Sequence, residues 1–384
     1  MDVVLSPDEQ SYRDAVREFV NGVLKPLVTT RFDFRRTQTR AEISEFRAAI
    51  SRHEIATTAP LRDDGSVDLI AFGIFIEEVS RLDGAFASLA QTLFFPVWDM
   101  ASLLVTDEQQ RVYGHLFAPG AIVSMGLSEP NAGSNPAQIE TTARRTDDGW
   151  IINGRKLWTS HAAIASGVLV AARKVDRPGK EVSLFLLDAD TDKYDVRTID
   201  CIGGDAIATC EVTLDEVHIP AFAEMTPGKA GLRSALHLVE QGRLKIVFQA
   251  IGIAQAALDL AVEYAKVRTQ GGRPIATFQL VQQMLADMAT EVELARLIAY
   301  RAASLMMAGD PARMEISMAK SYATEAAVRV ASLGIQVHGA MGLTRDCPAE
   351  RYLRDARMLT IPDGTTQIHK LVIGRALTGM SAFT

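Results

Sequence analysis

The chain has 384 residues, of which 48% are hydrophobic and 23% charged, and this predicts a globular protein of two or three domains. Its formal net charge of −7, with no stripe of Lys and Arg, argues against a nucleic-acid-binding protein. The sequence has no apolar run of about 18 residues, so we expect no membrane span. The N-terminus lacks the features of a signal peptide. Because the three cysteines are widely spaced, we expect no metal site and a cytoplasmic protein.

Helical periodicity dominates the first third of the chain. Ser6–Glu9 has the residues of a capping box with proline at the first helical position, and apolar side chains recur behind it at helical spacing. The same periodicity predicts helices near 41–50, 67–82 and 85–104. We therefore expect an N-terminal α-helical domain over residues 1–120.

Short apolar runs bounded by turn formers follow. Trp150–Gly154 comes after an Asp-Asp-Gly turn and predicts one arm of a hairpin. Gly167–Ala171 and Val182–Leu187 are predicted strands, and His218–Pro220 ends this region. We expect a β-domain over residues 121–230.

The rest of the chain returns to helical spacing. Long helices are predicted near 233–267, 279–308 and 312–337, so we expect a C-terminal helical domain over residues 231–384. The order of helices, strands and helices predicts an α+β multidomain protein.

Three segments contain candidate ligand-binding residues. Ser128–Ser134 is rich in turn formers, whose backbone can approach a ligand closely and offer amide donors. Asn153–Ser160 places Trp158 and two hydroxyls at a strand end. Arg268 precedes the Gly271-Gly272 pair. Taken singly, these segments are more often a surface loop, a core tryptophan and a solvated arginine.

The last quarter adds three segments in a fixed order, Gln336–Gly342, Arg354–Arg357 and Pro362–Ile368. In the last of them Asp363 precedes a glycine, and such a pair often forms a turn that caps the next helix. Together with the earlier segments, however, they resemble the acyl-CoA dehydrogenase family of flavoproteins over nearly the whole chain. In that family this stretch contains the catalytic base, a Glu before a Gly-Thr pair.

The resemblance implies a fold and a reaction. The fold has an N-terminal α-helical domain, a middle β-domain and a C-terminal four-helix bundle, with FAD between the last two. The enzyme would be an oxidoreductase acting on a CH–CH bond of an acyl thioester, carried by CoA or an acyl carrier protein, in fatty acid metabolism. A carboxylate removes the α-proton, a hydride passes to flavin N5, and electrons continue to an electron-transferring flavoprotein. Relatives are usually homotetramers in which two subunits contact each flavin.

The resemblance also assigns residues. Asp363 would be the catalytic base, with Arg243 under the active site. Trp158 would pack against the flavin ring, Ser160 would hydrogen-bond its edge, and Arg268 would reach the pyrophosphate from the neighbouring subunit, where a guanidinium offers charge and a planar donor fork. The expected cofactor contacts are Met125, Leu127, Ser128, Gly133, Ser134, Trp158, Ser160, Arg268, Gln270, Gln336, Gly339, Thr365 and Gln367.

The base position departs from the family pattern. Asp363 is shorter than Glu by one methylene, about 1.5 Å, and Pro362 replaces the usual Tyr. A minority of relatives hold the base directly before the arginine of the first C-terminal helix, but Gly242 stands there. Either the pocket lies closer to Asp363, or the substrate differs, or this carboxylate is not the base.

Other departures concern the surroundings. His161 replaces the usual Asn and is either structural or tunes the flavin, and Gly271 replaces a common Phe. His53–Ser66 stands where relatives have a Pro/Tyr-Gly-Gly segment that helps to shape the substrate pocket.

Two other classes of function stay open. One is an oxidase or monooxygenase on the same fold. Nitroalkane oxidase has Asp at the base position and Arg seven residues later, where this chain has Lys370. The other is a low-activity subunit of a hetero-oligomeric dehydrogenase.

Overall fold

The first helix begins where the capping box predicts it. Ahead of α1 (Pro7–Phe19), the Ser6 hydroxyl accepts a hydrogen bond from the Glu9 amide at 3.2 Å, and the Glu9 carboxylate accepts one from the Ser6 amide at 2.6 Å. This computed structural model describes residues 5–30, 32–33, 35–56, 60–94, 103, 105–118, 121–175, 181–226 and 231–382.

The N-terminal part is helical, as predicted. After α1 come α2 (Lys25–Thr30), α3 (Arg40–Ile50), α4 (Leu69–Leu82), α5 (Gly84–Phe94) and α7 (Asp107–Tyr113). The helix predicted near 85–104 corresponds to α5, and most of the residues beyond Phe94 in that stretch lie outside the described residues. α4 is buried along most of its length because it lies between the other N-terminal helices and the long helix α8.

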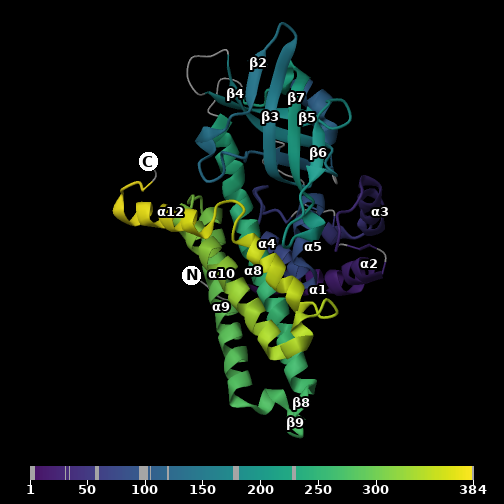
Figure 1. Cartoon of the computed structure of the whole chain (residues 1–384), viewed down its shortest axis with the longest axis vertical. Coiled ribbons are helices and arrows are strands. Elements are labelled where there is room, and N and C mark those ends of the chain that lie inside the picture. Colours follow the sequence, from purple (N-terminus) through teal and green to yellow (C-terminus); the bar gives the residue numbers. More distant parts are fainter. Residues whose placement is uncertain are drawn as a thin grey trace.

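A seven-stranded mixed sheet forms the middle of the chain (Figure 1). Its strands are β1 (Val123–Gly126), β2 (Thr142–Arg145), β3 (Gly149–Ser160), β4 (Gly167–Lys174), β5 (Val182–Asp188), β6 (Asp195–Thr198) and β7 (Thr209–Pro220). They pair in the order β1-β4-β2-β3-β7-β6, with β5 on β4. The predicted hairpin is confirmed, since β2 and β3 pair antiparallel with Arg145 opposite Trp150. β4 and β5 are buried almost throughout, which explains their continuous apolar sequences.

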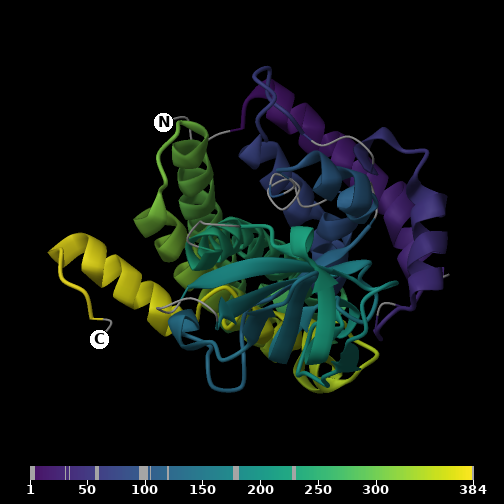
Figure 2. The ribbon, with the colours of Figure 1, turned by 90° about the horizontal axis from the view of Figure 1, so that it is seen from above.

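The C-terminal part is a bundle of long helices below the sheet (Figure 1). It contains α8 (Gly231–Val267), α9 (Gln279–Met307), α10 (Arg313–His338) and α11 (Ala349–Leu359), while α12 (Thr366–Thr378) extends away from the rest of the molecule (Figure 2). A small hairpin of β8 (Thr269–Gln270) and β9 (Arg273–Pro274) turns at Gly271 and Gly272, which both have positive φ. Among the described helices α8 alone is long and apolar enough to cross a membrane, but 67% of its most apolar stretch is buried inside the molecule, as in a core helix.

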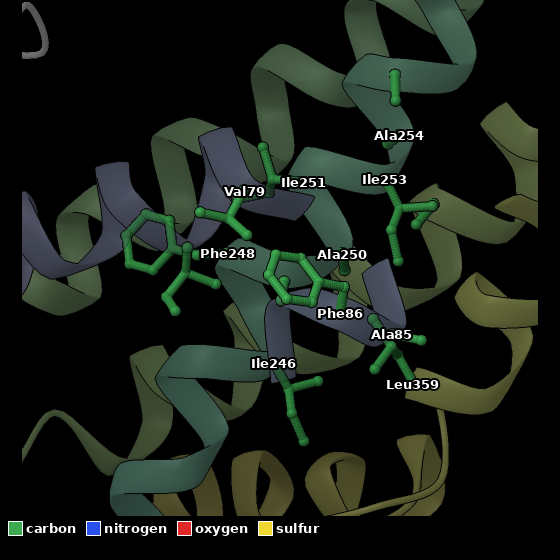
Figure 3. Close-up of a cluster of buried hydrophobic side chains, with 14 of the residues drawn as sticks. Val79, Ala85, Phe86, Ile246, Phe248, Ala250, Ile251, Ile253, Ala254 and Leu359 are labelled. Carbon is green, nitrogen blue, oxygen red and sulfur yellow. The ribbon is translucent and has the colours of Figure 1, made fainter. Parts of the chain in front are cut away.

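Close packing joins α8 to the N-terminal helices. Phe248 and Ile251 of α8 meet Val79 of α4 and Phe86 of α5 in the core (Figure 3). The helix backbones approach each other at Gly252, where an added Cβ would lie only 2.3 Å from the Glu77 carbonyl oxygen. This contact fixes α8, and therefore the residues along its first half, relative to the N-terminal helices.

A pair of buried carboxyl groups joins α11 to the other domains. The Asp355 carboxylate accepts a hydrogen bond from the Gly204 amide at 2.8 Å, and Arg351 pairs with Asp83 at 3.0 Å. Burial, and the neighbouring Asp83 carboxyl, raise the pKa of Asp355 to about 7. Burial also raises the pKa of Asp83.

This pair predicts stability that decreases as the pH rises. Between about pH 4 and pH 7 the folded chain holds more protons at this site than the unfolded chain, so the free energy of unfolding falls with increasing pH. Asp355→Asn keeps an acceptor for Gly204 and removes the charge, so we expect a higher Tm than wild type at pH 8 and a weaker pH dependence. Thermal unfolding from pH 5 to 8 measures this, with the exposed Asp346→Asn as control. An unchanged pH dependence in Asp355→Asn would contradict the assignment.

Candidate active site

The end of β3 presents an aromatic side chain on a strained backbone. The pairing of β3 with β7 shifts register between Lys156 and Thr159, and Trp158 has a φ of +62°. Such a backbone costs about 1–3 kcal/mol for a residue other than glycine and is found mainly at functional sites. The Trp158 side chain is 57% exposed, so the strained position presents its indole at the surface rather than to the core.

A buried ion pair holds the loop beside this strand. Lys156 donates to the Glu129 carboxylate at 2.5 Å and to the Leu127 carbonyl at 3.3 Å. Glu129 also accepts hydrogen bonds from the amides of Glu140 and Thr141. The loop backbone is thus fastened to β3, with Leu127 half-buried near Trp158. Of the other predicted loop and strand contacts, Met125 and Ser128 are half-buried, and Gly133, Ser134 and Ser160 are exposed.

The ion pair predicts a strong effect of its removal. Lys156→Met would leave the Glu129 carboxylate buried without a cation, and we expect a loss of about 3 kcal/mol in the free energy of unfolding. Denaturant unfolding measures this. Glu129→Gln combined with Lys156→Met removes both charges and should recover most of the loss, whereas the exposed Lys266→Met should change little. A single variant as stable as wild type would show that the pair does not hold the loop.

Buried polar atoms without partners lie next to Trp158. Within the described residues, the Thr159 hydroxyl and both ring nitrogens of His161 make no hydrogen bond. Burial, reinforced by the charge of Lys245, lowers the pKa of His161 to about 3, so this ring is neutral. Together with the exposed indole, these groups fit a ligand that has a flat ring and polar edges.

Asp363 lies in the turn between α11 and α12, on a left-handed backbone with φ +55°. Its carbonyl accepts a hydrogen bond from Arg243 Nε at 3.0 Å, and the next carbonyl, of Gly364, accepts one from Lys320 at 2.7 Å. Thr365, rather than Asp363, caps α12, because its hydroxyl accepts from the Ile368 amide at 3.4 Å. The alternative that Asp363 serves as the helix cap is therefore wrong.

The Asp363 carboxylate rests against α8 at Gly242. A Cβ added to Gly242 would lie 2.5 Å from Asp363 Oδ2, so the carboxylate occupies the space that a side chain would need. This contact explains why the chain combines Asp363 with glycine at position 242. A side chain at position 242 of α8 and the Asp363 carboxylate cannot both occupy this space. The structure brings Asp363, Arg243 and Thr365 together here.

Three cations surround this carboxylate. Burial raises the pKa of Asp363, while Lys245, Lys320 and Arg243 oppose the increase. Burial lowers the pKa of Lys320 to about 8 and also lowers that of Lys245. His369 is fully buried against Gly364, and burial together with Lys320 and Arg243 lowers its pKa to about 3. Because its pKa is lowered, His369 is a weak base, and Asp363, whose pKa burial raises, is the better candidate to accept a proton in this cluster.

Five predicted cofactor contacts lie elsewhere. Arg268 and Gln270 belong to the β8–β9 hairpin at the far end of the bundle, and the helix between Arg243 and Val267 alone spans about 36 Å at 1.5 Å per residue (Figure 1). His338 stacks on Tyr264 at 4.4 Å, which places the end of α10 near the same end of α8. The exposed Gln336 and Gly339 are at this end too. Gln367 is exposed on α12.

Lys245 was not among the predicted site residues. It lies on α8 three residues after Gly242, and its charge acts on both Asp363 and His161. A lysine within an otherwise apolar stretch of helix was the signal available in the sequence. Lys320 gave no comparable signal, because its importance comes from a contact 44 residues away.

Known proteins resemble this chain along most of its length. It matches the family descriptions "Acyl-CoA dehydrogenase, middle domain" over residues 124–217 and "Acyl-CoA dehydrogenase, C-terminal domain" over residues 229–378. A probable acyl-CoA dehydrogenase of Bacillus subtilis (strain 168) is 36% identical over 318 residues, which cover 81% of this chain and 83% of the relative. The short-chain specific mitochondrial acyl-CoA dehydrogenase of Mus musculus is 36% identical over 314 residues, with 80% and 75% covered. The solved glutaryl-CoA dehydrogenase of Mycobacterium smegmatis superposes with a TM-score of 0.87 at 31% identity, covering 99% of this chain and 97% of that chain. The chain belongs to the acyl-CoA dehydrogenase family.

Proposed function

We propose that this chain is an FAD-dependent dehydrogenase that introduces a Cα–Cβ double bond into a short acyl-CoA thioester, with Asp363 as the base. The observation that supports this most is the position of Asp363, seated on Gly242 in a turn whose two carbonyls are held by Arg243 and Lys320. A short acyl group is proposed because two of the similar proteins are named for short-chain and glutaryl thioesters.

The proposed reaction assigns a role to each group. The Cα–H bond breaks and its proton goes to an Asp363 carboxylate oxygen. A bound FAD would supply the two-electron acceptor that takes the β-hydrogen with its electron pair, so that the Cα–Cβ bond becomes double. Arg243 and Lys320 position the turn rather than contact the substrate, because their hydrogen bonds go to backbone carbonyls. Burial raises the pKa of Asp363 and so makes the carboxylate more basic.

The cofactor site is proposed to include residues of two subunits. Trp158, Ser160 and the loop at Leu127 would hold the flavin ring, while Arg268 of a second copy would hold the diphosphate. Support comes from the positions of these residues within one chain, since β3 belongs to the sheet while the β8–β9 hairpin lies at the far end of the helical bundle (Figure 1). We therefore propose a homotetramer, with electron-transferring flavoprotein as the acceptor and domain boundaries near 121 and 231.

An anaerobic titration of the purified protein with a series of acyl-CoA thioesters tests the function. We expect bleaching of the flavin absorbance by short-chain thioesters. If flavin is present and no thioester bleaches it, the proposal fails, and rapid reoxidation of reduced flavin by oxygen would instead favour an oxidase or monooxygenase. A chain that is flavin-poor until another subunit is added would indicate a hetero-oligomer.

Lys370, the counterpart of the arginine in nitroalkane oxidase, is exposed on α12.

A further inference from the structure

Lys245 lies at the centre of the proposed active site. It follows Gly242 by three residues on α8, so the two residues share the face of the helix on which the Asp363 carboxylate rests. Its side chain is half-buried, and its charge acts on Asp363 on one side and on His161 on the other. His161 is three residues from Trp158, so Lys245 lies between the base and the residues proposed to hold the flavin.

Its ammonium group lacks an acceptor within the part of the chain that the structure describes. The three lysines that are buried among the described residues are paired: Lys156 donates to Glu129 at 2.5 Å, Lys174 to Glu224 at 2.8 Å, and Lys320 to the Gly364 carbonyl at 2.7 Å. No hydrogen bond or ion pair of this kind is found for Lys245 among the described residues. A half-buried ammonium group that has no hydrogen-bond acceptor can bind the anionic group of a ligand without breaking an existing hydrogen bond.

The charges around Lys245 do not balance. Arg243, Lys245 and Lys320 face a single carboxylate, that of Asp363. Two nearby glutamates offset part of this charge, since Glu240 acts on Arg243 and Glu325 acts on Lys320, but Glu240 also pairs with a fourth cation, Arg313, at 3.2 Å. The described residues therefore leave an excess of positive charge beside the base, which attracts an anion.

We propose that Lys245 determines substrate specificity by binding a carboxylate on the acyl group, so that the preferred substrates are short dicarboxylic acyl thioesters. This inference rests on the proposed function. Lys245 lies beside the base that contacts Cα, so the anion must be within a few bonds of Cα. The phosphates of CoA are separated from the thioester by the long pantetheine arm, which leaves the acyl group as the source of the anion.

Matched pairs of ligands test the proposal. Succinyl-CoA and butyryl-CoA, and likewise glutaryl-CoA and pentanoyl-CoA, have equal acyl lengths and differ in one carboxylate. Binding to the FAD-loaded enzyme is followed anaerobically by perturbation of the flavin spectrum. We expect wild type to bind the better dicarboxylic ligand at least about tenfold more tightly than its partner, which corresponds to about 1.4 kcal/mol. Lys245→Met should abolish this preference, whereas Lys245→Arg should retain it.

Controls separate the possible causes. Lys266→Met removes an exposed lysine of the same helix and should leave the preference unchanged. A wild type without preference, or a preference that survives in Lys245→Met, would overturn the proposal. If both members of a pair bleach the flavin equally well, the role of Lys245 fails while the dehydrogenase function stands. If dicarboxylic ligands bind selectively through Lys245 but no thioester bleaches the flavin, the dehydrogenase function fails instead.

Discussion

The variant Asp363→Asn is expected to retain FAD but to reduce it with acyl-CoA about a thousandfold more slowly than wild type. The amide is nearly isosteric with the carboxylate, so it still fits over Gly242, and the backbone contacts of the turn with Arg243 and Lys320 do not involve the altered atoms. What is lost is the group that accepts the α-proton. Stopped-flow measurement of flavin reduction, with flavin content determined on the same sample, checks both parts of the expectation.

A matched variant and a pH profile make this test specific. The exposed Asp346→Asn should reduce its flavin at the wild-type rate. For wild type, the rate should increase with pH through the pKa of Asp363, which burial raises and the three neighbouring cations lower. Unchanged reduction kinetics in Asp363→Asn would remove the assignment of this residue as the base, and would direct attention to substrates whose oxidation needs no carboxylate.

The fold could be predicted because its signals are local. The capping box at Ser6, the hairpin before Trp150 and the long helical periods each depend on residues within one or two turns of each other, and the structure places them as predicted. The extent of α5 beyond Phe94 lies outside the described residues, so that part of the prediction stays open.

The active site was only partly predictable because its decisive contacts are distant in sequence. The motif identified Asp363, but no local pattern shows that its carboxylate rests on Gly242, 121 positions earlier. Nor does the sequence reveal the positive φ of Trp158, which comes from a change of register between two strands. The sequence shows Lys245 only as a lysine in an apolar stretch of helix, and the fold adds that its ammonium group has no hydrogen-bond acceptor among the described residues and lies near Asp363.

The separation of Arg268 from the β3 end has a different cause. Sequence motifs order residues along the chain, whereas the part of α8 between Arg243 and Val267, about 36 Å long at 1.5 Å per residue, separates Arg268 from the rest of the proposed site. The proposal that one cofactor contacts both the β3 end and Arg268 of a second copy makes assembly part of the proposed active site. Binding of FAD is then expected to depend on protein concentration.

The variant Gly242→Ala is expected to lose about a hundredfold in the rate of flavin reduction while its thermal stability stays equal to or above that of wild type. The added methyl would lie 2.5 Å from Asp363 Oδ2, so the carboxylate must move, and a displacement of about 1 Å can cost a hundredfold in rate. Alanine is a better helix former than glycine by about 1 kcal/mol, so the helix itself should not weaken. Stopped-flow reduction and thermal unfolding on the same preparation measure the two effects.

Two other glycines give this experiment its contrast. Gly252→Ala, on the same helix, would place a methyl 2.3 Å from the Glu77 backbone carbonyl oxygen, which cannot move without shifting α4, so we expect a lower Tm. Gly374→Ala on α12 has no atom within 4 Å of the added carbon and should change neither property. If Gly242→Ala instead reduced flavin at the wild-type rate, the carboxylate could move away from α8 without loss of function. The contact with Gly242 would then not be what positions the base. If it lost stability as Gly252→Ala does, the contact would be structural, and Asp363 would have to be tested as the base by its own variant alone.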